Sequence, residues 1–228
     1  MHVEIWSDIA CPWCYIGKRR FETALAAFEH SEEVRVTWRS FELDPHAPPL
    51  REGDRAAHLA EKYRMSYGQA VGMQDHMTRV AATEGLDFRF DIARAGNTFD
   101  AHRLVHLAAA HELQDAMKER LLAAYLGEGE LMSDRQALER LAVEIGLPGE
   151  EVRDALEGDR FAADVREDER SAESLGISAV PFFVVDRSFG ASGAQAPEII
   201  GKLLQRAWAE RLPLSVVAQG ESCGPDGC

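Results

Sequence analysis

Two cysteines near the N-terminus, Cys11 and Cys14, constrain the fold of this chain more than any other feature. They follow residues 2–6, in which polar and apolar side chains alternate as in a short strand. Pro12 suits the first turn of a helix, because the N–H that a proline lacks has no partner there. Residues 34–38 alternate again and predict a second strand. The chain therefore starts as strand, helix and strand, with a Cys-x-x-Cys motif where the helix begins.

This position of the two cysteines favours redox chemistry. The free N–H groups and partial positive charge of a helix N-terminus stabilise a thiolate, so we expect the pKa of Cys11 to fall to about 3.5–7.5. Cys14, one turn further on, should be more buried and less acidic. Cys11 would attack a disulfide and Cys14 would resolve the mixed disulfide, with Pro12 and an exposed Trp13 indole beside them. Asp8 is interpreted as a turn residue, or as an acid that accepts a proton or raises the thiol pKa.

Metal binding is the competing interpretation of the cysteines. A zinc site needs four ligands, and the only other thiols, Cys223 and Cys228, lie at the far C-terminus. His102 and His106 have the spacing of metal ligands on a helix, but no third ligand accompanies them. We interpret them as ordinary surface or interface histidines. The sequence therefore predicts no metal and no other cofactor.

The middle of the chain predicts helices alone. Prolines at 45, 48 and 49 mark a loop, and no strand pattern follows until residue 181. Residues 133–136 fit a capping box that starts at Ser133, Asn97 is a plausible N-cap, and Pro148 can begin another helix. Residues 181–185 and 189–191 predict two strands, and Pro197 begins a last helix. The predicted order is βαβ, a helical insertion, then ββα.

Composition narrows the choice of partners. The chain has 25 Lys and Arg against 39 Asp and Glu, a formal net charge of −14. This acidic excess repels phosphate backbones and anionic lipids, so we expect neither nucleic-acid nor membrane partners. The N-terminus lacks the basic and apolar regions of an export signal. We therefore expect a cytoplasmic protein, in a reducing compartment where paired cysteines more often indicate redox chemistry than structural disulfides.

Residues 8–14, Asp-Ile-Ala-Cys-Pro-Trp-Cys, resemble the active-site segment of the DsbA-type branch of the thioredoxin superfamily, in particular its FrnE-like members. Residues 178–183 are similar to the loop that faces the dithiol in that superfamily. The resemblance implies that Pro181 is a cis-proline beside Cys11 and that the Val180 backbone pairs with a client strand. An ordinary trans proline at the start of a strand is the alternative.

The same resemblance implies an α/β, thioredoxin-like fold with an all-helical insertion, as in DsbA. We expect a thioredoxin-like domain from residues 1–43 and 176–212, a helical insertion domain from 44–175, and a C-terminal tail from 213–228. In that tail Cys223 and Cys228 enclose a turn-prone Gly-Pro-Asp-Gly, and FrnE-like proteins with a C-terminal Cys-x4-Cys have a similar pattern. This auxiliary pair either exchanges with Cys11 and Cys14 or only clasps the tail.

The sequence thus predicts a thiol–disulfide oxidoreductase, or isomerase, acting on protein thiol and disulfide clients, with glutathione or thioredoxin as candidate electron partners. One alternative keeps the fold and changes the chemistry. It is a glutathione-dependent small-molecule isomerase or transferase, similar to 2-hydroxychromene-2-carboxylate isomerase and the kappa-class transferases. Those proteins usually have a single Ser or Cys at the nucleophile, so Cys14 argues against them. A polyketide-tailoring role and a chaperone that uses its thiols only as ligands are further alternatives.

Overall fold

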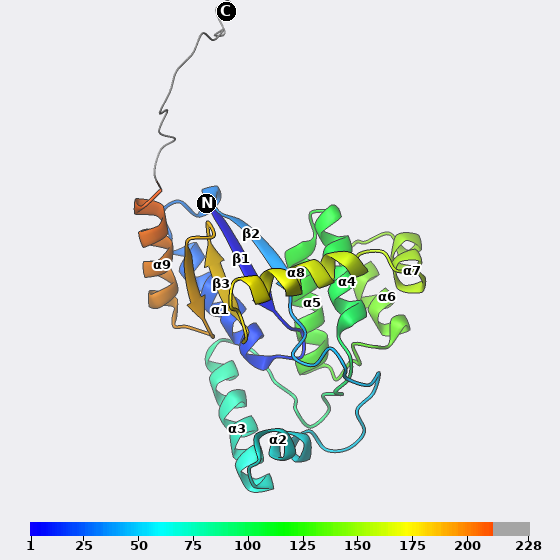
Figure 1. Cartoon of the computed structure of the whole chain (residues 1–228). Helices are drawn as coiled ribbons and strands as arrows, with labels where there is room; N and C mark the ends of the chain where they lie inside the picture. Colours follow the sequence, from blue (N-terminus) through cyan, green and yellow to red (C-terminus); the bar gives the residue numbers. More distant parts are fainter. Residues whose placement is uncertain (212–228) are drawn as a thin grey trace, which may run out of the picture.

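A four-stranded mixed sheet lies at the centre of the fold (Figure 1). The computed structural model describes residues 1–211. The strands are β1 (His2–Ser7), β2 (Arg35–Ser40), β3 (Phe182–Val185) and β4 (Phe189–Ser192), in the order β2-β1-β3-β4. Strands β1 and β2 are parallel, and the β1–β3 and β3–β4 pairs are antiparallel. A parallel pair needs a crossover, which α1 (Pro12–Ala26) and the short 3-10 turn η1 (Ser31–Glu33) provide. All four predicted strands are confirmed.

Strand β1 is buried on both of its faces because helices cover both sides of the sheet. Val3 and Ile5 point into the main hydrophobic core, whereas Trp6 belongs to a smaller cluster on the opposite face. The Trp6 indole N–H donates a 2.9 Å hydrogen bond to the carbonyl oxygen of Asp168, in the helix α8 (Ala162–Ser174). This strand therefore ends at Ser7 in the interior of the protein, where the Cys-x-x-Cys segment begins.

The two sides of the sheet are covered by different helices (Figure 1). Helix α1 packs against α9 (Pro197–Ala209) on one side, and α8 crosses the other. Phe21 of α1 stacks on Phe183 of β3, with ring centroids 5.8 Å apart. As predicted, Pro197 is the first residue of α9. The sheet thus holds α1, and with it the two cysteines, in a fixed position.

Within residues 41–181, between β2 and β3, the structure has helices and connecting loops only, as predicted. Their side chains share one core cluster with the sheet, in which Ile5 of β1 and Leu104 and Leu121 of the helices are fully buried. No helix within residues 1–211 is long and apolar enough to cross a membrane. The helices before α8 are α2 (Arg55–Tyr63), α3 (Tyr67–Thr83), α4 (Phe99–Ala110), α5 (Gln114–Gly127), α6 (Arg135–Glu144) and α7 (Gly149–Glu157).

Two predicted helix caps are wrong by one residue. Helix α6 is capped by Asp134, whose carboxylate accepts the N–H groups of residues 136 and 137, while the Ser133 hydroxyl donates to the carbonyl oxygen of Pro49. A carboxylate at this position satisfies two free N–H groups at once, which explains why it replaces the serine. Helix α4 begins after Thr98 rather than Asn97, although the Asn97 side chain still accepts the N–H of Phe99 at 2.9 Å.

Candidate active site

The N-terminus of α1 presents the two cysteines one turn apart. Cys11 is the N-cap residue and Pro12 occupies the first turn, as the sequence predicts. The Cys14 N–H donates a 3.0 Å hydrogen bond to the carbonyl oxygen of Cys11. Both cysteines are free thiols; Cys11 is 5% exposed and Cys14 is fully buried. Of the two cysteines, only Cys11 therefore has any exposed surface.

The surroundings of the two thiols shift their pKa values in opposite directions. The pKa of Cys11 is lowered, chiefly because the Cys14 thiol and backbone N–H groups stabilise its thiolate. The pKa of Cys14 is raised well above its ordinary value because burial, and then the neighbouring Cys11, disfavour a second thiolate. As the pH rises, Cys11 therefore loses its proton before Cys14 does.

The loop before β3 lies against Cys11. The Val180–Pro181 peptide bond is cis, and the Cys11 thiol donates a 3.6 Å hydrogen bond to the Val180 carbonyl oxygen. Gly17 of α1 faces the Pro181 ring so closely that a Cβ at Gly17 would lie 2.8 Å from the proline Cγ. The structure thus brings together two motifs that lie about 170 residues apart in the sequence. The absence of a side chain at Gly17 lets helix α1 and the Pro181 loop approach each other closely.

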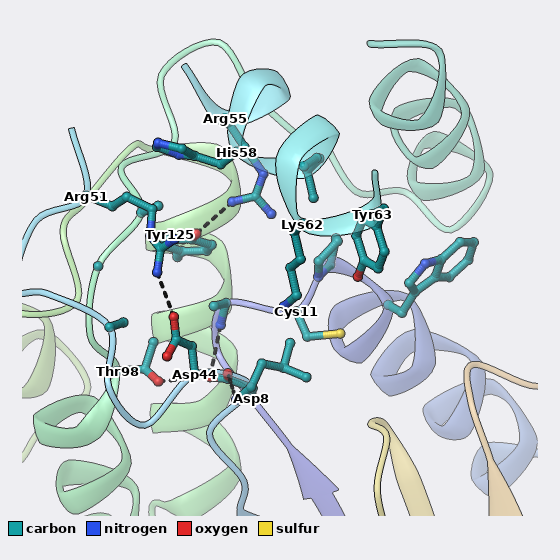
Figure 2. Close-up of a pocket in the computed structure, with 18 of the residues that line it drawn as sticks. Asp8, Cys11, Asp44, Arg51, Arg55, His58, Lys62, Tyr63, Thr98 and Tyr125 are labelled. Carbon is teal, nitrogen blue, oxygen red and sulfur yellow. Dashed lines mark hydrogen bonds and ion pairs between the residues drawn. The ribbon is translucent and has the colours of Figure 1, made fainter. Parts of the chain in front are cut away.

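Trp13 and Asp8 differ from their predicted surroundings. The Trp13 indole is partly buried and packs against the main core, so it is not the exposed side chain that we predicted. Asp8 is buried, and its carboxylate accepts hydrogen bonds from the Leu43 N–H at 2.8 Å and the Thr98 hydroxyl at 3.0 Å (Figure 2). Asp8 is therefore an anion enclosed by donors, and more than a turn residue.

His102 completes the surroundings of Asp8. Burial would raise the pKa of Asp8, but hydrogen bonds from His102 at 3.3 Å and from backbone N–H groups lower it below its ordinary value. His102 is fully buried, and burial lowers its own pKa. His106 contacts Ser40 and Asp168 instead. The prediction of ordinary surface or interface histidines is thus wrong for His102, whose partner is a buried anion beside the dithiol. Within residues 1–211 no group of three or more His, Cys, Asp or Glu side chains could hold a metal ion.

Lys118 of α5 is a site residue that the sequence analysis missed. Its side chain is fully buried, and its Nζ donates a 2.9 Å hydrogen bond to the carbonyl oxygen of Ser7. Burial lowers the pKa of Lys118 to about 8, while the negative charges of Cys14 and Asp8 partly oppose that shift. A lysine in a helix usually faces solvent, so the residue type alone gives no reason to place Lys118 in the site. Its spacing to Leu121, Leu122 and Tyr125 is the signal that places it on the buried face of α5.

A cavity of about 610 Å³ opens beside Cys11. Its walls come from the Cys11 segment, the loop after β2, and helices α2 and α3 (Figure 2). Pro12 and Trp13 line it together with Cys11, whereas Val180, which accepts the Cys11 hydrogen bond, and Pro181 are not among its lining residues. The predicted pair Cys223 and Cys228 lies outside the described residues. Cys11 thus contacts the loop before β3 and also lines the cavity.

This fold and this dithiol are those of the thioredoxin-like proteins. Residues 2–205 match the model of the DSBA-like thioredoxin domain, and the chain belongs to that family. This confirms the α/β, thioredoxin-like fold with helices inserted between β2 and β3, as in DsbA. The probable DsbA oxidoreductase SCO1869 from Streptomyces coelicolor is similar to it, with 46% identity, a TM-score of 0.94, and coverage of 100% of this chain and 98% of that one.

Two other proteins match this chain at lower identity. The uncharacterized protein YwbO of Bacillus subtilis (strain 168) is 27% identical over 187 residues, which cover 81% of this chain and 86% of that protein. The cytosolic disulfide reductase DsbM from Pseudomonas aeruginosa, solved with GSH, has 19% identity and a TM-score of 0.65, covering 92% of this chain and 100% of that one. At this identity the likeness to DsbM shows a shared fold alone.

Proposed function

We propose that this chain is a cytoplasmic thiol–disulfide oxidoreductase of the FrnE-like type, with isomerase activity toward mispaired protein clients. The single observation that carries the proposal is the contrast between the two sulfurs. Cys11 borders solvent and has a lowered pKa, whereas Cys14 is sealed behind it and has a raised pKa. A thiolate is the attacking species in disulfide exchange, so Cys11 is the nucleophile and Cys14 the resolving thiol.

The reaction proceeds in two exchanges. The Cys11 thiolate attacks one sulfur of a client disulfide, so a Cys11–client bond forms, the client disulfide breaks, and the departing client thiolate takes up a proton. Cys14 then loses its proton and attacks the Cys11 sulfur, which releases the second client thiol and leaves a Cys11–Cys14 disulfide. The client gains two electrons that the protein loses. Glutathione or thioredoxin would supply these electrons again in a reducing cycle.

The second exchange requires a base for the Cys14 proton, and we assign this role to Lys118. The lysine is buried with the dithiol and its pKa is about 8, so a useful fraction is neutral at cellular pH. Proton transfer converts a thiol and an amine into a thiolate and an ammonium ion, which stabilise each other in the protein interior. The charge of Lys118 lowers the pKa of Cys14, in keeping with this coupling.

The loop beside Cys11 provides a place for the client backbone. Val180 lies near the end of the loop that leads into β3, and its carbonyl oxygen accepts the hydrogen bond from the Cys11 thiol. An extended client segment would pair with the Val180 backbone, with Pro181, Pro12 and Trp13 forming the surface around the sulfur. Main-chain pairing is tolerant of sequence, which suits an enzyme with many clients.

A glutathione-dependent small-molecule isomerase or transferase is the second candidate. A solved 2-hydroxychromene-2-carboxylate isomerase has a TM-score of 0.71 and 15% identity, covering 92% of this chain and 98% of that one, a likeness of fold. The cavity beside Cys11 favours this candidate because a small molecule fits it. Cys14 disfavours it, since a nucleophile that only activates glutathione has no use for a resolving thiol.

Trapping experiments separate the two candidates. Cys14→Ser should accumulate mixed disulfides between Cys11 and unfolded protein clients, and Cys11→Ser should lose the reduction of an insulin-type disulfide. Non-reducing electrophoresis and a turbidity assay measure these outcomes. Equal activity of Cys11→Ser and the unsubstituted protein would exclude a Cys11-dependent oxidoreductase.

A further inference from the structure

One face of helix α2 forms a wall of the cavity beside Cys11. Arg55, His58, Leu59 and Lys62 are spaced i, i+3, i+4 and i+7, which places them on the same side of a helix. All four line the cavity that also contains Cys11. In Figure 2 the Lys62 side chain extends from α2 toward Cys11, and the Arg55 guanidinium lies beside Tyr125. The wall therefore carries a cation at each end.

These two cations lack the acidic partners that most cations of this chain have. Arg51, at the rim of the same cavity, is paired with Asp44 at 2.6 Å. Within residues 1–211 neither Arg55 nor Lys62 forms an ion pair, although the chain carries a net charge of −14. Glu61 also lines the cavity, but forms no ion pair with either of them. The α2 wall thus carries two cations without ion-pair partners in the described part of the chain, and the carboxylates of Asp8 and Asp44 in the same cavity are held by other donors.

The Arg55 side chain is also held in place, but one of its N–H groups lacks a hydrogen-bond acceptor. Its Nη1 donates a 2.7 Å hydrogen bond to the Tyr125 hydroxyl, and its guanidinium lies 5.0 Å from the Phe90 ring centroid. Its Nε is buried and has no hydrogen-bond partner. A buried donor without an acceptor is unfavourable, so this edge of the guanidinium favours an acceptor that can approach it. A pre-oriented guanidinium is suited to a carboxylate.

The dimensions of the site fit a small molecule. Arg55 and Lys62 are seven residues apart, which corresponds to about 10 Å along a helix. A cavity of about 610 Å³ falls within the range of small-molecule sites. Between the cations α2 contributes His58 and the apolar Leu59, and Met73 and Met77 of α3 add apolar surface to the same cavity. The ligand therefore has carboxylates at its periphery and a less polar centre.

We propose that this cavity binds a carboxylate-bearing, low-molecular-weight disulfide, with Arg55 and Lys62 holding its carboxylates while its disulfide reaches Cys11. The inference rests on the proposed thiol–disulfide function and names a substrate class for it. The Cys11 thiolate attacks one ligand sulfur, and the ligand disulfide breaks. Cys14 then displaces the second half. The ligand is reduced to two thiols, which take the two protein thiol protons, and the protein is oxidised to its Cys11–Cys14 disulfide.

The test uses three disulfides of similar size and different charge: dithiodipropionate (anionic), hydroxyethyl disulfide (neutral) and cystamine (cationic). The full-length protein is reduced, freed of reductant, and mixed with excess probe, and the second-order rate of its oxidation is measured at low and high salt. Each rate is divided by that of dithiothreitol with the same probe, which removes the intrinsic reactivity of the disulfide. The readout is the ratio of the anionic to the neutral normalised rate.

We expect this ratio to be about tenfold or more at low salt and to decrease at high salt, because exposed charges are screened. Lys62→Gln and Arg55→Gln should each lower it about fivefold. Lys202→Gln, the same charge change on an exposed residue of α9, should keep the original ratio. Lys62 is exposed, so its variant tests the site even if Arg55→Gln misfolds.

Two results would overturn the inference. They are a ratio near one, or a ratio that Lys62→Gln and Lys202→Gln leave equally unchanged. Complete inertness of the reduced protein toward all three probes has a different meaning, because it contradicts the thiol–disulfide function itself.

Discussion

The ammonium group of Lys118 donates a 2.9 Å hydrogen bond to the carbonyl oxygen of Ser7, the last residue of β1. This contact fixes a fully buried lysine at the point where the central strand leads into the Cys11 segment. Burial lowers the pKa of Lys118 to about 8, so the lysine destabilises the fold while it is charged. A stability cost of this kind is common at functional sites and leads to two predictions.

Lys118→Met should stabilise the protein at neutral pH. The lowered pKa corresponds to a cost of about 3 kcal/mol below pH 8, and losing the bond to Ser7 returns about 1 kcal/mol of it, so a net gain of about 2 kcal/mol is expected. Between about pH 8 and 10.5 the unfolded chain binds the extra proton, so the native protein gains stability as the pH rises and the advantage of the variant disappears.

Urea unfolding of the reduced protein at several pH values measures this effect. Lys202→Met, on the surface of α9, is the matched control and should change stability by less than about 0.5 kcal/mol. A Lys118→Met protein that is less stable at pH 7 would show that the buried ammonium is a net stabiliser.

The same substitution should slow the second exchange. In the unsubstituted protein the rate at which Cys14 resolves a mixed disulfide should rise through about pH 8, as the coupled pair of Cys14 and Lys118 loses its first proton. In Lys118→Met the rise should move up by at least about one pH unit, because burial keeps the pKa of Cys14 high. Stopped-flow release of a chromophoric thiol from Cys11 measures this rate. Identical profiles would remove Lys118 from the mechanism.

Gly17 should not tolerate a methyl group. Its Cβ would meet the Pro181 ring at 2.8 Å, so Gly17→Ala should cost about 1–3 kcal/mol and displace the loop beside Cys11. Gly72, in α3, has open space around it, and Gly72→Ala should stabilise the helix by up to about 1 kcal/mol. Thermal unfolding of both variants checks the contrast. A neutral Gly17→Ala would mean that the loop can move away from α1 without cost.

The C-terminal cysteine pair is tested by removal. Suppose that Cys223 and Cys228 exchange with the Cys11–Cys14 disulfide. In a chain that ends at residue 222, the rates of client reoxidation and isomerisation should then differ several-fold from those of the full chain, whereas the rate of client reduction should stay within about twofold. Reduced and scrambled ribonuclease provide the assays. Unchanged rates in all of them would assign no catalytic role to the pair.

Local sequence signals predicted much of the fold and the centre of the site. Alternation located the strands, and Pro12 located the start of α1, because these features depend on neighbouring residues. The roles of Lys118 and His102 were not predicted, because they contact Ser7 and Asp8 from helices about a hundred residues away. The spacing along α5 indicates that Lys118 is buried, but only the packing shows which residues it meets. The same holds for Trp13, which a local pattern describes as exposed but which the core partly covers.

Titration of the two thiols in the reduced protein is the decisive measurement. The rate at which iodoacetamide alkylates the Cys11 peptide, followed by mass spectrometry across the pH range, reports its thiolate fraction, and Cys11→Ser provides the background. We expect the Cys11 pKa to lie below that of an ordinary free cysteine, and Cys14 to stay unalkylated in the pH range where Cys11 reacts. A Cys11 pKa at or above about 8.5, that of an ordinary free cysteine, would contradict the assignment of Cys11 as the activated nucleophile.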